Sequence, residues 1–186
     1  MSGEDRRPAL DRLLERWLGD DGPAHLGSGW LSGTASVFLG TLALGAVAVL
    51  WLPEWLSTAR FRALYPLGLV RALIQGLIVL AFLLGAVSLL LRRRKVLGLT
   101  GCGLALLAAL LGGGQVPIDG PLDRPLTLGL DWFLLNLFLL ALVFVPIERL
   151  FPRRPGQGVF RPGWTTDLAH FGASHALVQA MSFLVL

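Results

Sequence analysis

Uncharged apolar runs alternate with short polar segments along most of the chain. Five runs contain no Asp, Glu, Lys or Arg, and they are 22, 20, 21, 16 and 19 residues long. A helix needs roughly 20 residues to cross about 30 Å of hydrocarbon. The pattern therefore predicts an all-α, multi-pass transmembrane helical bundle with about five spans: Leu31–Leu52, Ala72–Leu91, Val96–Val116, Trp132–Ile147 and Leu168–Leu186.

The polar segments divide the chain into four parts. Residues 1–30 form a cytosolic and interfacial arm, 31–147 a four-span bundle, 148–166 a cytoplasmic connector and 167–186 the fifth helix. In the arm, Pro8–Leu18 has apolar residues at helical spacing on one face and charges on the other, which predicts a short amphipathic helix. It lies on the membrane interface or packs on a cytosolic loop or partner.

The positions of the cations predict the orientation. With the N-terminus in the cytoplasm, 12 of the 16 Lys and Arg residues lie inside, four each in the arm, in Arg92–Lys95 and in the connector. The other four lie outside: Arg60, Arg62, Arg71 and Arg124. Because cytoplasmic loops are enriched in Lys and Arg, this split predicts a cytoplasmic N-terminus in the inner (plasma) membrane.

Composition excludes several other classes of protein. Hydrophobic residues make up 54% of the chain and charged residues 15%, against roughly 25% in soluble domains. A soluble enzyme or a disordered tail would carry more charge. The net charge of +4 lies in clusters between apolar runs, so we expect no nucleic-acid partner. Cys102 is the one cysteine, which excludes an intrachain disulfide.

Small residues recur at every fourth position in three spans, which favours close approach of helices in lipid. They are Ser32, Ser36 and Gly40; Gly68, Ala72 and Gly76; and Gly101, Ala105, Ala109 and Gly113. We expect these stripes to form the contacts of a packed bundle or of a dimer seam.

The titratable residues of the last two spans indicate no reaction. His170 and His175 are five residues apart on one helix, about 140° apart around its axis, so they do not share a face. The candidates for their polar partners are Gln75, Gln115 and Asn136. Asp131 and Asp167 open the fourth and fifth spans, where the helix dipole stabilises a carboxylate. Asp167 can also pair with His170, one turn further on.

One segment carries a more specific pattern. Residues 146–152 read P-I-E-R-L-F-P, and residues 156–171 read G-Q-G-V-F-R-P-G-W-T-T-D-L-A-H-F. This segment resembles the sterol desaturase / fatty acid hydroxylase superfamily of membrane-bound oxygenases, whose bacterial members have a similar stretch before the catalytic region. The resemblance implies lipid metabolism and an oxidoreductase-like chain in a bacterial inner membrane.

The resemblance also implies what this chain lacks. The family hydroxylates lipids at a di-iron centre held by histidine boxes (His-x-x-x-His and His-x-x-His-His), and neither pattern occurs here. We therefore expect the N-terminal membrane portion of such an enzyme, inactive alone, with no cofactor and no catalytic or metal residue of its own. The residues that match the family motif are expected to be structural: Glu148, Arg149, Arg161, Trp164, Asp167 and His170.

The fifth run reaches the last residue of the sequence without a polar stop, which suggests truncation. Thr165 or Thr166 is expected to cap the helix of this run. Expected partners are membrane lipids and a missing C-terminal catalytic portion or a homo-oligomer. The alternative function is a non-enzymatic membrane scaffold or a small transporter subunit.

Overall fold

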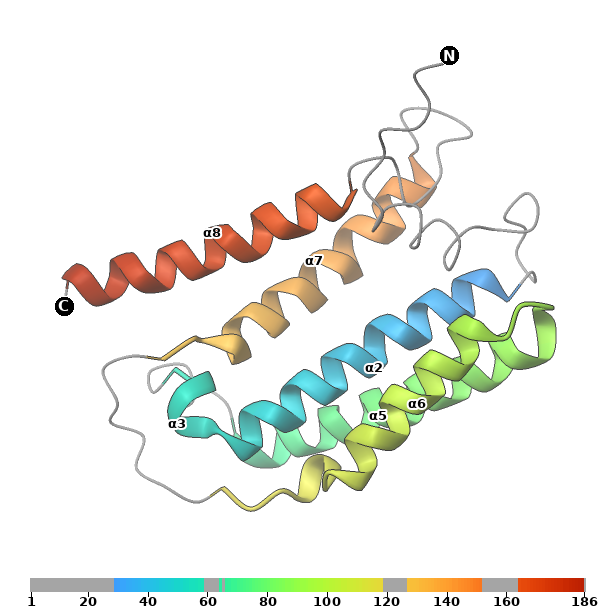
Figure 1. The fold of residues 1–186 in the computed structure, drawn as a ribbon, viewed down its shortest axis with the longest axis horizontal. Helices are drawn as coiled ribbons and strands as arrows, with labels where there is room; N and C mark the ends of the chain where they lie inside the picture. Colours follow the sequence, from blue (N-terminus) through green and yellow to red (C-terminus); the bar gives the residue numbers. More distant parts are fainter. Residues whose placement is uncertain (1–28, 59–63, 65, 119–126, 152–163, 186) are drawn as a thin grey trace, which may run out of the picture. The chain divides into compact units, whose positions relative to one another are not determined.

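Helices make up all the regular structure of the described residues. The structure is a computed structural model that describes residues 29–58, 64, 66–118, 127–151 and 164–185, except for the side chains of 149–150 and 182–185. The elements in Figure 1 are α2 (Trp30–Trp51), α3 (Pro53–Leu56), α5 (Leu67–Leu91), α6 (Val96–Leu110), the 3-10 turn η1 (Gly113–Gln115), α7 (Leu130–Leu150) and α8 (Trp164–Val185). The predicted all-α helical bundle is confirmed.

Four described segments are long and apolar enough to cross a membrane: Trp30–Trp51, Leu67–Leu91, Val96–Gln115 and Leu130–Glu148. They correspond to the first four predicted spans. The fifth predicted span coincides with α8, a helix of 22 residues. α8 is not among these four segments, and its side chains are described only as far as Met181. That α8 crosses the membrane therefore stays a prediction.

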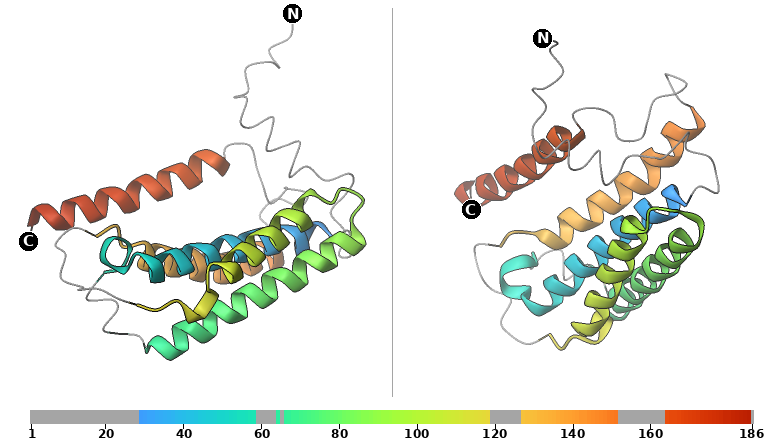
Figure 2. Two further views of the ribbon diagram at one scale, coloured as in Figure 1. Left: turned by 60° about the horizontal axis from the view of Figure 1, so that its bottom comes forward. Right: turned by 45° about the vertical axis from the view of Figure 1, so that its right-hand side comes forward.

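The contacts divide the described residues into two compact units. Unit 1 contains α2 up to Val47 and the segment Leu67–Val116, which includes α5, α6 and η1. Unit 2 contains the end of α2, α3, α7 and α8. Within unit 1, the three long helices lie side by side, as both views in Figure 2 show.

The helices of unit 1 meet through small side chains. The Ser36 side chain of α2 is fully buried, and its hydroxyl donates to the Ala81 carbonyl of α5 at 2.6 Å. A Cβ on Gly101 of α6 would lie 1.9 Å from the same hydroxyl oxygen, and one on Gly85 would lie 2.6 Å from Cys102 Sγ. We call these five residues the Ser36 seam. Since lipid gives helices no hydrophobic reason to associate, such close packing stabilises the unit.

Two of the three predicted small-residue stripes contribute to this packing. Gly40 would place a Cβ 2.9 Å from the Leu104 Cβ, and Ala105 is fully buried. The stripe in α5 does not contact the other helices of this chain, because Cβ atoms on Gly68 and Gly76 would meet nothing within 4 Å, and its role in a dimer seam stays a prediction. A second set in the same helix forms the contact instead: Ala81, Gly85 and Ser88.

Side chains donate hydrogen bonds to backbone carbonyls at the end of unit 1 where α2 begins and α5 ends. Ser88 Oγ of α5 donates to Gly29 O at 2.8 Å, directly before α2 begins. Gly29 has φ +72°, and a Cβ there would lie 2.9 Å from the Leu91 Cβ, so the position requires glycine. Lys95 Nζ donates to Leu89 O. The Arg92 side chain is 5% exposed, whereas the three cations after it are exposed.

One predicted span boundary needs correction, and another agrees with the structure. α5 begins at Leu67 rather than Ala72, because Arg71 fits inside the helix and its Nη2 donates to the Val116 carbonyl at 3.1 Å. The third predicted span, Val96–Val116, agrees with the apolar segment Val96–Gln115, and its α-helix α6 ends at Leu110, just before the glycine run 112–114. Gly112 has φ +102°, a conformation that an α-helix cannot contain, and the chain continues as η1.

The remaining predictions concern the segments around α8. α8 begins at Trp164, so Thr165 and Thr166 lie within its first turn rather than at its cap. The amphipathic helix predicted at Pro8–Leu18 and most of the connector lie outside the described residues.

Candidate functional site

The motif residues occupy two helix ends in unit 2. Glu148 is exposed near the end of α7, and Trp164 is half-buried at the start of α8. Asp167 and His170 are exposed on the first two turns of α8. Arg161 and the Arg149 side chain lie outside the described residues. The described part of the motif therefore flanks the connector and forms no closed site.

A polar cluster lies at the opposite end of α7. The Asp131 carboxylate accepts the Ser57 hydroxyl at 2.9 Å, the Thr58 N–H at 3.1 Å and the Trp132 N–H at 2.8 Å. The Leu128 N–H also donates to Trp55 O of α3 at 2.8 Å. The sequence placed Asp131 correctly in the first turn of the helix. From the sequence, the only interaction expected for Asp131 was with the dipole of its own helix. In the structure, its carboxylate also binds the segment that follows α3 through hydrogen bonds.

His175 connects α8 to the same end of α7. Its Nε2–H donates a hydrogen bond to the Leu128 carbonyl at 3.2 Å. Its ring centroid lies 4.9 Å from that of Phe133, and Phe171 lies 5.2 Å from Phe133 on the same side. Tilted aromatic pairs at these separations are favourable beyond the area they bury. His175 is therefore held by packing and one hydrogen bond, which is a structural role.

These contacts fix the register of the two helices. Phe133 is the fourth residue of α7, while Phe171 and His175 are the eighth and twelfth of α8. The two helices run in opposite directions, and the middle of α8 lies beside the first turn of α7. The aromatic contacts and the hydrogen bond to the Leu128 carbonyl hold this register.

Most of these partners were not predicted from the sequence. The candidate partners of the histidines included Asn136, but its side chain donates to Trp132 O of its own helix at 3.1 Å. Gln75 and Gln115 belong to unit 1. A backbone carbonyl such as Leu128 O has no sequence signal. The adjacent hydroxyls of Ser57 and Thr58, directly after an apolar segment, were the available signal for the Asp131 cluster.

No iron site can be assembled from the described residues. Over the part of the chain that the structure describes, no three His, Cys, Asp or Glu side chains come close enough to share a metal ion. Cys102 is buried, and its sulfur lies 3.6 Å from the Phe82 carbonyl in the Ser36 seam. The described residues therefore do not fit the di-iron centre that the resemblance implies for the complete family.

The apolar helices and their packing through small residues define the chain as an all-α membrane protein. No protein-family model, no curated protein and no solved structure matches it. The class of the protein thus rests on its own residues.

Proposed function

We propose that this chain is the membrane-embedded portion of a lipid hydroxylase or desaturase of the sterol desaturase / fatty acid hydroxylase superfamily. We place it in a bacterial inner membrane with a cytoplasmic N-terminus. The observation that carries the proposal is the motif in residues 146–171. Its setting supports it, since the motif joins the end of one apolar helix to the start of another.

The role proposed for the chain is to hold and orient rather than to catalyse. In a hydroxylation, one oxygen atom of dioxygen enters a lipid C–H bond, and the other becomes water after two electrons and two protons are supplied. The chain has three histidines, too few for the family's histidine boxes. Its own residues would hold the connector, whose two ends are flanked by Glu148 on α7 and Asp167 on α8.

The test compares two plasmids in a bacterial host that lacks such an enzyme. One encodes residues 1–186 alone, and the other encodes the whole genomic reading frame that contains them. We expect mass spectrometry to detect lipids that gain one oxygen atom only with the second plasmid, whose protein product should also bind iron. A reading frame without clustered histidines, or a whole product without oxidised lipid, would refute the enzymatic proposal.

A non-enzymatic scaffold is the second candidate, and one observation favours it. The buried hydroxyls of Ser36 and Ser88 both donate to backbone carbonyls of neighbouring segments, so these two groups serve packing rather than substrate binding. On this alternative neither plasmid changes the lipids, and deletion of the chain alters the assembly of another membrane protein instead.

A further inference from the structure

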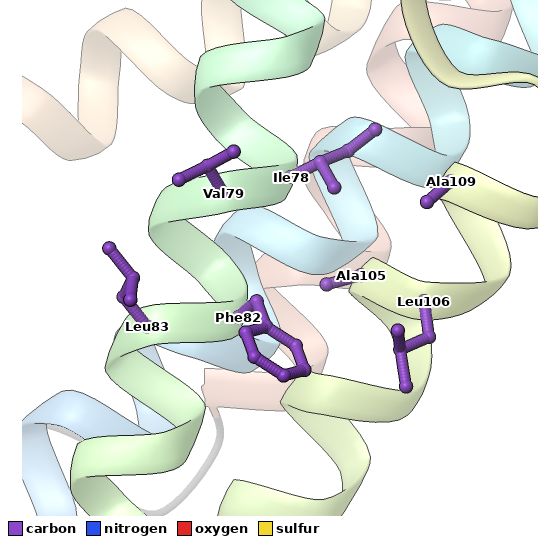
Figure 3. Close-up of a pocket in the computed structure, with 7 residues that line it drawn as sticks. All are labelled: Ile78, Val79, Phe82, Leu83, Ala105, Leu106 and Ala109. Carbon is purple, nitrogen blue, oxygen red and sulfur yellow. The ribbon is translucent and has the colours of Figure 1, made fainter.

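An open apolar groove runs between α5 and α6 on the surface of unit 1. Its volume is ≈ 220 Å³, and all of its lining residues are apolar. Ala105 and Ala109 of α6 contribute only methyl groups, whereas Phe82 and Leu83 of α5 form a taller wall. Figure 3 shows Phe82 reaching from α5 towards α6 across this groove. Both helices belong to segments apolar enough to cross a membrane, so in a membrane the groove would lie at the depth of the hydrocarbon.

The groove is aligned with the cationic turn between the two helices. Lys95 precedes Leu106 of the groove by 11 residues, which on a helix is about 16 Å along the axis and within about 20° of the same direction. Leu99 lies between them on this face, and it is 61% exposed. On α5, Leu90 extends the same surface towards the turn and is 84% exposed. An exposed leucine therefore lies between the groove and the cations on each of the two helices.

The distance along α6 from the cationic turn to the groove matches the hydrocarbon thickness of one leaflet. Half of the hydrocarbon core is about 15 Å thick, so with Lys95 at the surface the groove lies near the bilayer midplane. An acyl chain whose headgroup sits at the turn would end in the groove. The exposed cations Arg93, Arg94 and Lys95 lie where the phosphate of that lipid would be. Basic pockets between membrane helices attract anionic headgroups in this way.

We propose that unit 1 holds one anionic phospholipid, with its phosphate at Arg93–Lys95 and one acyl chain in the α5–α6 groove. A second copy of the chain is the less favourable occupant. A two-fold dimer in a membrane brings the same residues of both copies to the same depth. Such a dimer through this groove would place two clusters of three cations beside each other. The site does not depend on the proposed enzymatic function.

Native mass spectrometry of the purified full chain tests the site with two probes. These are phosphatidylglycerol and phosphatidylcholine with identical acyl chains. Ala109→Phe fills the groove, and Leu110→Phe is its control, because Leu110 is the neighbouring residue and is 84% exposed. Arg93→Gln with Arg94→Gln removes two headgroup cations, and Arg153→Gln with Arg154→Gln removes two cations elsewhere in the sequence.

We expect the unmodified chain to bind phosphatidylglycerol about tenfold more tightly than phosphatidylcholine. The Arg93/Arg94 variant should lose this preference, Ala109→Phe should weaken both lipids, and the two controls should change neither. Equal binding of the two lipids, or equal behaviour of Ala109→Phe and Leu110→Phe, would overturn the proposal. A change of oligomeric state in Ala109→Phe with unchanged lipid binding would assign the groove to a second copy. If Ala109→Phe fails to fold, comparing the Arg93/Arg94 variant with the Arg153/Arg154 control still decides whether the chain selects the anionic lipid through these cations.

Discussion

Replacing Gly101 with alanine is expected to destabilise the chain in detergent, whereas Gly103→Ala is expected to leave its stability unchanged or increase it. The new Cβ at position 101 would lie 1.9 Å from Ser36 Oγ and 2.7 Å from Ser36 Cβ. Rotation of the serine relieves only the first of these clashes. At Gly103, two residues further along α6, a Cβ would meet nothing within 4 Å.

The two substitutions should differ in sign as well as in size. Alanine is favoured over glycine in a helix by about 1 kcal/mol, and both positions gain this. Overpacking of a close helix contact costs about 1–3 kcal/mol and sometimes more. We therefore expect Gly101→Ala to lower the thermal midpoint, measured by circular dichroism in detergent, and Gly103→Ala to maintain or raise it.

A rescue experiment identifies the clash as the cause. Ser36→Gly removes the two serine atoms closest to the new Cβ and leaves the backbone C of residue 36 at 3.1 Å, so it should restore part of the stability lost in Gly101→Ala. Equal thermal midpoints for Gly101→Ala and Gly103→Ala would show that α2 and α6 do not meet at the Ser36 seam.

Replacing Asp131 with alanine is expected to release the segment that follows α3. The carboxylate accepts four hydrogen bonds, three of them from Ser57 and Thr58. A hydrogen bond to a charged group contributes about 1.5–3 kcal/mol. We expect the Thr58 amide to exchange with solvent at least about tenfold faster in Asp131→Ala, as measured by hydrogen–deuterium exchange.

Asp167→Ala is the matched control for this experiment. Asp167 also lies in the first turn of its helix, so it has the same relation to a helix dipole as Asp131. It should leave exchange at Thr58 unchanged, and Ser57→Ala should have an intermediate effect. If Asp131→Ala and Asp167→Ala alter Thr58 equally little, then Asp131 serves only its own helix, as the sequence alone indicated.

The long helices could be predicted because hydrophobicity is a property of local sequence. The run Leu31–Leu52 reproduces α2 within one residue at each end. The rule failed where a polar side chain has a distant partner. Arg71 was taken as a boundary because it is charged, yet the Val116 carbonyl, 45 residues away, allows it to lie inside α5. The glycine run 112–114 was a usable signal for a helix end, and the positive φ of Gly112 ends α6 there within an uncharged run.

The contacts of the candidate sites were less predictable. The spacing of small residues indicates that a helix can pack closely but not on which side, and α5 contains two such sets. Gly68 and Gly76 fit the spacing as well as Ala81 and Gly85 do, and only the three-dimensional arrangement distinguishes them. The Asp131 cluster joins residues more than 70 positions apart, partly through a backbone N–H group that no sequence pattern marks.

Reporter fusions in a bacterial host test most directly the claim that the chain is a multi-span membrane protein with a cytoplasmic N-terminus. Fusions after residues 22, 95 and 158 should be active only with a cytoplasmic reporter, and fusions after 62 and 122 only with an external one. A fusion after Leu186 should report the external side if α8 crosses the membrane. Activity of an external reporter after Lys95 would contradict the orientation, and cytoplasmic signals at all positions would contradict the membrane assignment itself.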